Sequence, residues 1–343
     1  PIQASFATSD IDGSESIGPI TTISGVPAGA TLIQGTLLPS GAWQVSSTEL
    51  AAGHVSIRPP ANSDSDFTLT FTAQVIDHGA GTTDSRDVTT TGTITVTAVA
   101  DAPTVITANA TGAEDSWIPL TGLGAALTDA DGSESLSYTI SGLPTGATLS
   151  IGTHNANGSW SLTPDQLAHV SIKPPQDFSG GFDLTLTATS TEARDGNPSA
   201  SSSAPFHVTV TPVADPGTMT AHGSGAEDSW IPIQASFATS DIDGSESIGP
   251  TTTISGVPAG ATLNQGTQLP SGAWQVSSTE LAAGHVSIRP PANSDADFTL
   301  TFTAQVIDHG AGTTDARDVT TTGTITVTAV ADAPTVVTAD ATG

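Results

Sequence analysis

A short acidic motif recurs three times in the sequence, and its residue types suit a metal ion. The pattern Asp-x-Asp-Gly-Ser-Glu places carboxylates around a glycine turn. Calcium takes six to eight oxygen ligands in flexible geometry, whereas Mg²⁺ requires near-octahedral geometry and retains water, so the motif favours Ca²⁺. The loop is not an EF-hand, because the twelve-residue loop with flanking helices is missing. The candidate ligands are Asp10, Asp12 and Glu15, then Asp129, Asp131 and Glu134, then Asp241, Asp243 and Glu246.

Two further acidic motifs repeat along the chain. A Glu-Asp pair precedes a Ser-Trp, and a Val-Ala-Asp triplet closes each repeat. The chain has 34 Asp and Glu against 6 Lys and Arg, a formal charge of -28. This balance excludes a nucleic-acid or anionic-membrane binder, and it leaves little cationic charge to neutralise the acids. The further candidate ligands are Glu114, Asp115, Glu227 and Asp228, with Asp101, Asp215 and Asp332.

The elements that position these acids belong to a tandem repeat. Residues 1–112 reappear almost unchanged as residues 232–343, and a diverged copy lies between them. The period is the size of one β-sandwich domain. We therefore predict repeats at 1–101, 102–215 and 216–332, with 333–343 as the start of a further one. The first repeat lacks the Glu-Asp-Ser-Trp lead-in, so we expect a segment cut from a longer array.

Alternating residues indicate strands within each repeat. In 67–76, apolar side chains alternate with Thr, Gln and Ile, and residues 93–99 alternate in the same way. Such period-two patterns, separated by Pro- and Gly-containing turns, predict an all-β fold of antiparallel β-sandwich domains strung end to end. One helical turn is expected at 48–52, with a counterpart at 163–168. Trp43, Trp117, Trp160, Trp230 and Trp274 recur in register, which favours core or junction packing.

Strand direction predicts which acids meet. If the first strand of a repeat begins near Trp117, its Asp-x-Asp loop lies at the far end of the domain, beside the next linker. Asp129, Asp131 and Glu134 would then meet Asp215, Glu227 and Asp228, with Asp308 as a further candidate. Asp10, Asp12 and Glu15 would meet Asp101, Glu114 and Asp115, with Glu192 or Asp195 nearby. Carboxylates this close repel one another, and Ca²⁺ would relieve the repulsion.

Several sequence motifs together resemble a known family. Glu-Asp-Ser-Trp-Ile-Pro-Leu, Leu-Thr-Asp-Ala-Asp-Gly-Ser-Glu-Ser-Leu, Ile-Ser-Gly-Leu-Pro-Thr-Gly-Ala-Thr-Leu and Val-Thr-Pro-Val-Ala-Asp resemble the extender repeats of giant RTX-type bacterial adhesins. The resemblance covers the whole chain. It implies immunoglobulin-like or cadherin-like sandwiches whose linkers are stiffened by calcium, with the family's calcium motif on Asp129, Asp131, Glu134 and their counterparts. It also implies type I secretion to the bacterial surface. The first and third repeats depart from the pattern by inserting Gly-Pro at 18–19 and 249–250.

We therefore expect a calcium-stiffened spacer that projects a distant adhesive domain, with neighbouring repeats of the same chain as partners and a monomeric state. The distal ligand is unknown. The alternative is an adhesive module that binds glycan or ice through Thr-rich strand faces, although Thr is also an ordinary solvent-facing strand residue. We do not expect an enzyme, because the paired carboxylates lie at predicted domain ends and no Gly-x-Ser-x-Gly motif occurs. A zinc site at His78 and Asp77 lacks further ligands nearby. The sequence has no cysteine and no stretch long and apolar enough to cross a membrane.

Overall fold

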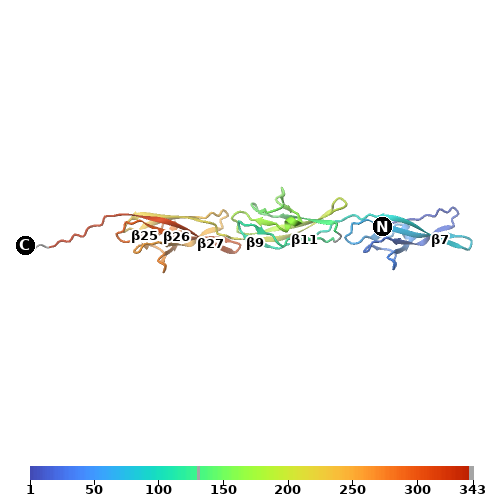
Figure 1. The fold of residues 1–343 in the computed structure, drawn as a ribbon, viewed down its shortest axis with the longest axis horizontal. Helices are drawn as coiled ribbons and strands as arrows, with labels where there is room; N and C mark the ends of the chain where they lie inside the picture. Colours follow the sequence, from blue (N-terminus) through green and yellow to red (C-terminus); the bar gives the residue numbers. More distant parts are fainter. Residues whose placement is uncertain (130–131, 340–343) are drawn as a thin grey trace, which may run out of the picture. The chain divides into compact units, whose positions relative to one another are not determined.

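The computed structural model describes residues 1–129 and 132–339, and within them the chain is almost entirely β-structure (Figure 1). The described residues form two compact units. Unit 1 contains 1–106, 124–139 and 187–204, and unit 2 contains 107–123, 140–186 and 205–343. Strands β12 (Glu134–Ser141), β17 (Gly180–Glu192) and β18 (Ser199–Thr211) have residues in both units. The predicted repeat boundaries differ from this division and remain predictions.

Unit 1 contains a five-stranded sheet in the order β3-β4-β1-β6-β7, with smaller sheets β2-β5 and β8-β11. The register places Glu15 of β1 opposite Asp77 of β6, and β6 pairs with β7 along its whole length. The elements are β1 (Glu15–Ser24), β2 (Thr31–Leu32), β3 (Thr36–Leu37), β4 (Trp43–Ser46), α1 (Ser47–Ala51), β5 (Ile57–Arg58), β6 (Phe67–His78), β7 (Thr83–Ile94), β8 (Thr104–Ile106) and β11 (Gly124–Ala126).

Unit 2 contains a nine-stranded sheet in the order β22-β25-β20-β19-β27-β26-β21-β24-β23 and a small sheet β10-β16-β13. A six-stranded sheet, β14-β15-β12-β17-β18-β9, contains the strands that the units share. The first elements are β9 (Ala110–Ala113), β10 (Ile118–Pro119), β13 (Thr148–Leu149), β14 (Thr153–His154), β15 (Trp160–Leu162), α2 (Pro164–Leu167) and β16 (Ser171–Lys173). The remaining ones are β19 (Thr218–Ala226), β20 (Ile231–Ala238), β21 (Glu246–Ser255), β22 (Thr262–Leu263), β23 (Thr267–Gln268), β24 (Trp274–Ser277), α3 (Ser278–Ala282), β25 (Ser287–Arg289), β26 (Phe298–Gly310) and β27 (Thr313–Thr328).

The alternating pattern determines which side chains are buried. In β6 the apolar residues Leu69, Phe71 and Ala73 are buried, and the Thr residues between them are more exposed. The cores of both units are mainly aliphatic, and their buried aromatic residues are Phe71 and Tyr138 in unit 1 and Phe206 and Phe302 in unit 2. Removing this apolar surface from water stabilises each sheet against its neighbours. The all-β prediction is confirmed.

Two strand pairs in the described part of the chain are parallel, which the sequence analysis did not anticipate. Strand β9 pairs in parallel with β18, and β19 pairs in parallel with β27. The parallel partner also determines where the last strand of a repeat ends. Strand β27 continues to Thr328 beside β19, whereas β7 ends at Ile94. The prediction that residues 93–99 form one strand was therefore wrong, and the N–H of Val96 donates instead to Asp66.

The expected helical turns are present and properly capped. The Ser46 hydroxyl accepts from the N–H of Glu49 at the start of α1, and Thr163 forms a capping box with Gln166 at α2. Trp117 and Trp230 are about half exposed, so they do not pack in the core, and the alternative that they pack at a junction stays a prediction. Among the described residues, no helix has the length and hydropathy that a membrane span requires.

Candidate metal centre

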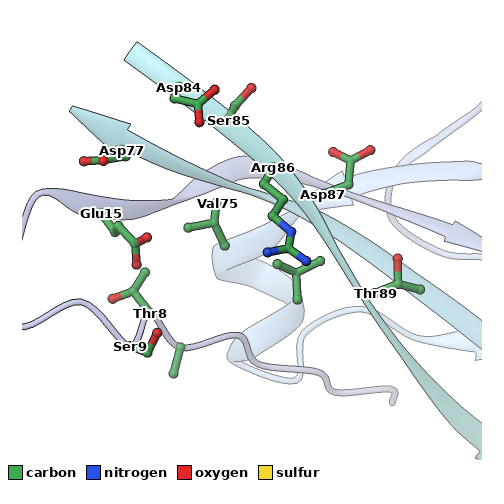
Figure 2. Close-up of a pocket in the computed structure, with 12 residues that line it drawn as sticks. Thr8, Ser9, Glu15, Val75, Asp77, Asp84, Ser85, Arg86, Asp87 and Thr89 are labelled. Carbon is green, nitrogen blue, oxygen red and sulfur yellow. The ribbon is translucent and has the colours of Figure 1, made fainter. Parts of the chain in front are cut away.

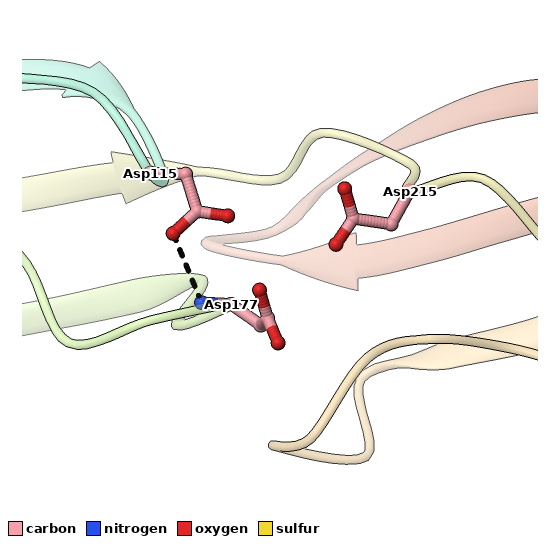
Figure 3. Close-up of side chains that lie close together, drawn as sticks. All are labelled: Asp115, Asp177 and Asp215. Carbon is pink, nitrogen blue, oxygen red and sulfur yellow. Dashed lines mark hydrogen bonds between the residues drawn. The ribbon is translucent and has the colours of Figure 1, made fainter.

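Three aspartates of unit 2 bring their carboxylates together (Figure 3). One carboxylate oxygen from each of Asp115, Asp177 and Asp215 lies within 4.8 Å of the others. Asp115 follows β9, Asp177 follows β16, and Asp215 lies in the linker between β18 and β19. The N–H of Asp177 donates to Oδ1 of Asp115 at 3.3 Å. Asp115 and Asp177 have φ of +52° and +54°, a left-handed conformation that Asp tolerates better than most residues.

Successive linker N–H groups beside these aspartates donate to carboxylates. Val213 donates to Glu114 and to Asp308, at 2.5 and 3.0 Å. Ala214 donates to Asp315 at 2.9 Å, and Asp215 donates to Glu246. Carboxylates from several strands therefore hold the linker through its backbone. We call Glu114, Asp115, Asp177, Asp215, Asp241, Glu246 and Asp308 the unit 2 cluster.

Several buried oxygens of this cluster have no hydrogen-bond partner. Asp308 is 1% exposed, and its Oδ1 is unpartnered. The second oxygens of Glu114 and Glu246 are also buried without a partner. An unpaired buried acceptor is costly, and a charged one more so, unless a cation or a proton satisfies it. These oxygens fit a hard cation that takes oxygen ligands.

Positive charge is scarce around the unit 2 cluster, where Arg317 opposes the raised pKa of Asp215. Desolvation raises the pKa of Glu114 to about 8, and neighbouring Asp308 adds to the effect. Desolvation also raises the pKa of Asp177, Asp215 and Glu246, and nearby carboxylates contribute to each of these shifts. Ionised Glu114 and Asp308 are both acceptors, so a hydrogen bond between them requires one proton. Without a cation, protons therefore stabilise this cluster.

The carboxylate of Asp241 differs from the others in the cluster because backbone N–H groups of its own loop donate hydrogen bonds to it. Desolvation opposes its ionisation, but hydrogen bonds from the N–H groups of Asp243, Glu246 and Gly244 lower its pKa overall. Asp10, its counterpart in the first repeat, also has a lowered pKa through hydrogen bonds with Asp12 and Ser14. In the first and third repeats, hydrogen bonds to the first aspartate therefore organise the Asp-x-Asp-Gly-Ser-Glu loop and favour the ionised form of that aspartate.

Unit 1 contains a second group of acids around the linker before β8. Asp64, Asp101, Asp129 and Glu192 line a pocket of about 260 Å³. The N–H of Asp101 donates to Oε1 of Glu134 at 2.8 Å, as Asp215 donates to Glu246 in unit 2. We call Asp64, Asp101, Asp129, Glu134 and Glu192 the unit 1 cluster.

The glutamates of the unit 1 cluster are deeply buried. Glu192 is 2% exposed and Glu134 is 8% exposed, and Oε2 of each is unpartnered. Desolvation raises the pKa of Glu192, with contributions from Glu134, Asp64 and Asp129, although a hydrogen bond with Ser133 opposes the shift. Asp131 lies outside the described residues. The unit 1 cluster therefore has the same unsatisfied buried oxygens as its counterpart.

A third acidic site lies at the first repeat's own Asp-x-Asp loop. Glu15, Asp77 and Asp84 line a pocket of about 550 Å³ that Arg86 of β7 also lines, and Figure 2 shows the Arg86 side chain to one side of these three acids. Asp77 is exposed, whereas its counterpart Asp308 is buried.

The structure corrects how the sequence analysis grouped the acids. Glu114 lies beside Val213, next to Asp215, and was predicted beside Asp101. Glu134 binds the N–H of Asp101 and was predicted beside Asp215. Glu227 binds the N–H of Val330, near Asp332, and was predicted beside Asp215.

The physical reason is an uncounted strand before each Glu-Asp pair. Strand β9 precedes Glu114 and runs parallel to β18, with Ala113 opposite Thr211. It carries Glu114 to the end of the repeat where β18 leads into the linker. Strand β19 carries Glu227 beside the end of β27 in the same way. Glu114 and Glu227 therefore contact the linker that follows their own repeat, and Glu134 and Glu246 contact the linker that precedes theirs.

Some predicted ligands do not join the clusters, and some cluster residues were missed. Asp12 is exposed, Asp228 accepts from the N–H of Asn293 at 3.1 Å, and Asp332 is exposed. Asp64 and Asp177 were not predicted. The signal for Asp177 is its position two residues after a Pro-Pro pair, where Asn62, Asp177 and Asn293 share a positive φ.

Comparisons with known proteins give distant structural matches. No protein-family model matches the chain, and no curated protein sequence matches it. The chain is similar to mouse cadherin-23 EC22–24 with a TM-score of 0.41 and 16% identity, over 91% of this chain and 87% of the other. The match to protocadherin gamma B2 domains 1–5 has a TM-score of 0.40 and 14% identity, over 92% and 53%. The match to the human desmocollin-1 ectodomain has a TM-score of 0.33 and 11% identity, over 95% of this chain and 57% of the other. The chain thus spans about half the length of the last two.

Proposed function

We propose that this chain is a calcium-stiffened spacer within a large bacterial surface adhesin, placed between the cell and a distal adhesive domain. One observation supports the proposal most strongly. The linker N–H groups of Val213, Ala214 and Asp215 are held by carboxylates whose remaining oxygens include buried, unpartnered ones. A bound Ca²⁺ would supply the positive charge that these oxygens lack.

The residues of the unit 2 cluster have distinct roles in this proposal. Asp115, Asp177 and Asp215 offer oxygens close enough together to share one ion. Glu114 and Glu246 fix the linker backbone through Val213 and Asp215 while keeping a second oxygen free of protein partners. Because linker and ligands are connected, binding would restrict the linker's conformations. A spacer gains stiffness from this restriction.

The calcium concentration that such sites require also favours the proposed extracellular location. Extracellular calcium modules work at about 10⁻⁴–10⁻³ M, far above cytosolic calcium. Export of an unfolded chain by type I secretion, followed by folding on contact with calcium, agrees with this range and with the RTX-type resemblance. The first test is thermal unfolding in chelator and in millimolar calcium. Saturation at a hundred times Kd adds about 2.7 kcal/mol to the stability, so identical melting curves would contradict the proposal.

A second candidate function is ligand binding through hydroxyl rows on the strands. Thr72 and Thr89 face each other across β6 and β7 with oxygens 3.4 Å apart, and Thr303 and Thr320 repeat this across β26 and β27 at 3.2 Å. These exposed rows offer a regular surface to a glycan or to ice. A glycan-array and ice-recrystallisation assay on the full chain would distinguish this function from a spacer.

A further inference from the structure

Unit 1 contains a positively charged residue, Arg194, at a position where unit 2 has an uncharged one. Arg194 forms an ion pair with Asp64, with Nε 3.3 Å from Oδ2. The Asp64 side chain is 8% exposed, whereas Arg194 is 58% exposed. Asp64 also lines the pocket that Asp101, Asp129 and Glu192 line. The guanidinium charge is therefore tied directly to the acids of the unit 1 cluster.

Uncharged residues occupy the equivalent positions in unit 2. Asp64 stands three residues before Phe67, and Ser179 stands three residues before Phe182. Arg194 stands two residues after Glu192, and its equivalent two residues after Asp308 is Gly310. Ser179 and Gly310 pack closely, and the Ser179 hydroxyl donates to the carbonyl of His309 at 3.4 Å. Close neutral packing thus replaces the ion pair. Arg317 lowers the pKa of Asp215 from a distance, but among the described residues it forms no ion pair with the unit 2 cluster.

A second position changes the charge in the same direction. Asp177 of the unit 2 cluster is buried and accepts from the N–H of Ile242 at 3.2 Å. Its counterpart in unit 1 is Asn62, whose Nδ2 donates to the carbonyl of Thr128 at 3.1 Å. Unit 1 therefore has a neutral amide where unit 2 has a carboxylate, as well as a guanidinium where unit 2 has a glycine.

We propose that Arg194 is a built-in counter-cation of the unit 1 cluster, so that Ca²⁺ binds there more weakly than at the unit 2 cluster. The inference rests on the proposed calcium function and adds that the two clusters fill at different calcium concentrations. The unpartnered Oε2 atoms of Glu134 and Glu192 leave room for one more positive partner. The arginine reduces the negative potential that attracts the ion, and it also limits repulsion when calcium is absent.

The size of the effect follows from electrostatics. A unit charge several ångströms from a divalent ion, at an effective dielectric constant near 20–40 and with some salt screening, changes affinity by roughly tenfold. Arg194→Gln removes this charge and Arg194→Lys retains it. Arg289→Gln removes an equal charge from the exposed end of β25 and serves as the control.

Hydrogen–deuterium exchange of the full chain, followed through a calcium titration, reports each cluster separately. Peptides covering 96–102 contain the Ala98 and Asp101 amides, which donate to Asp195 and Glu134. Peptides covering 212–217 contain the Val213, Ala214 and Asp215 amides. In the wild type, we expect 212–217 to become protected at lower calcium than 96–102. Arg194→Gln should lower the 96–102 midpoint roughly tenfold without moving the other midpoint.

The possible outcomes distinguish failure of the counter-cation inference from failure of the proposed function. Arg194→Lys and Arg289→Gln should both leave the 96–102 midpoint within about twofold of the wild type. In chelator, Arg194→Gln should speed exchange in 96–102 several-fold, because the counter-charge is lost. If calcium protects both linkers but Arg194→Gln changes neither the midpoint nor the exchange in chelator, the counter-cation inference is wrong and the proposed function stands. If calcium protects neither linker, both the proposed function and this inference are wrong.

Discussion

The backbone N–H of Val213 donates a 2.5 Å hydrogen bond to Oε1 of Glu114, which lies 99 positions earlier in the chain. The same N–H lies 3.0 Å from Oδ2 of Asp308. One linker amide is therefore shared by acids from two predicted repeats. The remaining oxygens of these two acids, Glu114 Oε2 and Asp308 Oδ1, are buried without a hydrogen-bond partner. This arrangement is costly without a cation, and it leads to the following predictions.

Replacing Glu114 with Gln should change ion-free and calcium-bound stability in opposite directions. The amide retains an oxygen for the N–H of Val213 and removes the repulsion with Asp308. In chelator at pH 8 we expect a melting temperature higher by about 2–4 °C, which corresponds to about 1 kcal/mol. The stabilisation by calcium should decrease, because a ligand charge is lost. Calorimetry with and without calcium measures both effects. Asp165→Asn on exposed α2 is the control, and equal effects of the two substitutions would contradict this account.

Removing calcium should make the stability of the protein depend more strongly on pH between about 5 and 8. Folding raises the pKa of Glu114 to about 8, so the folded state binds more protons than the unfolded state between about pH 4.5 and 8. The free energy of unfolding then falls as pH rises through this window. In chelator, the protein should become more stable as pH is lowered from 8 to about 5. In calcium the gain should be smaller, because protons compete with the ion. Urea titrations at several pH values measure this, and stability that rises towards pH 8 in chelator would contradict it.

Asp177→Asn tests the residue that the sequence analysis missed. Asn occupies the matching positions Asn62 and Asn293, with the same positive φ, so the backbone tolerates the change. Loss of one carboxylate from the group formed with Asp115 and Asp215 should weaken calcium binding roughly tenfold. Titration with the luminescent ion Tb³⁺, displaced by calcium, measures this. The control is Asp183→Asn on exposed β17, and equal affinities of Asp177→Asn and the wild type would remove Asp177 from the site.

Small-angle scattering should detect stiffening by calcium. A compact globule of this length has a radius of gyration near 20 Å by the usual scaling. Three sandwiches in line, each about 35–40 Å long, would exceed 30 Å. We expect a value above 30 Å with calcium, and a broader and shorter distribution of distances in chelator. A value near 20 Å in calcium would favour a joint binding surface over a spacer.

Local features of the fold could be read from the sequence because they depend on local physics. Alternation in 67–76 gave the buried face of β6, and residues near 48 and 163 gave the helical turns α1 and α2. These patterns depend on side-chain period and capping, which need only neighbouring residues. Strand partners were harder to predict. Residues 93–99 alternate in the same way as their counterparts in β27, yet only β27 has the parallel partner β19 that extends it.

The sequence identified the acidic residues of the clusters more reliably than it predicted which of them lie close together. The repeated motifs identified Glu114, Glu134, Asp215 and Glu246 as candidate ligands, and the structure places each beside a linker. Their grouping failed because β9 is short and weakly patterned, and one uncounted strand reverses every direction after it. Asp177 was missed because it occurs singly. Asp64 was missed because the Asp64-Ser65-Asp66 pair, which recurs as Asp295-Ala296-Asp297, was not counted among the acidic motifs. The burial of Asp308 could not be read from sequence, because the identical-looking Asp77 is exposed.

Calorimetric titration of the chelator-stripped full chain with calcium chloride tests the central claim most directly, because it measures binding without assuming any structural response. The account predicts saturable binding of more than one ion per chain, with dissociation constants at or below about 10⁻³ M. Magnesium at the same concentration should bind more weakly, and Glu114→Gln combined with Asp177→Asn should remove the tightest binding step. Heats that stay at the level of dilution up to about 10 mM calcium, ten times that limit, would show that these buried carboxylates are satisfied by protons alone and would contradict the calcium account.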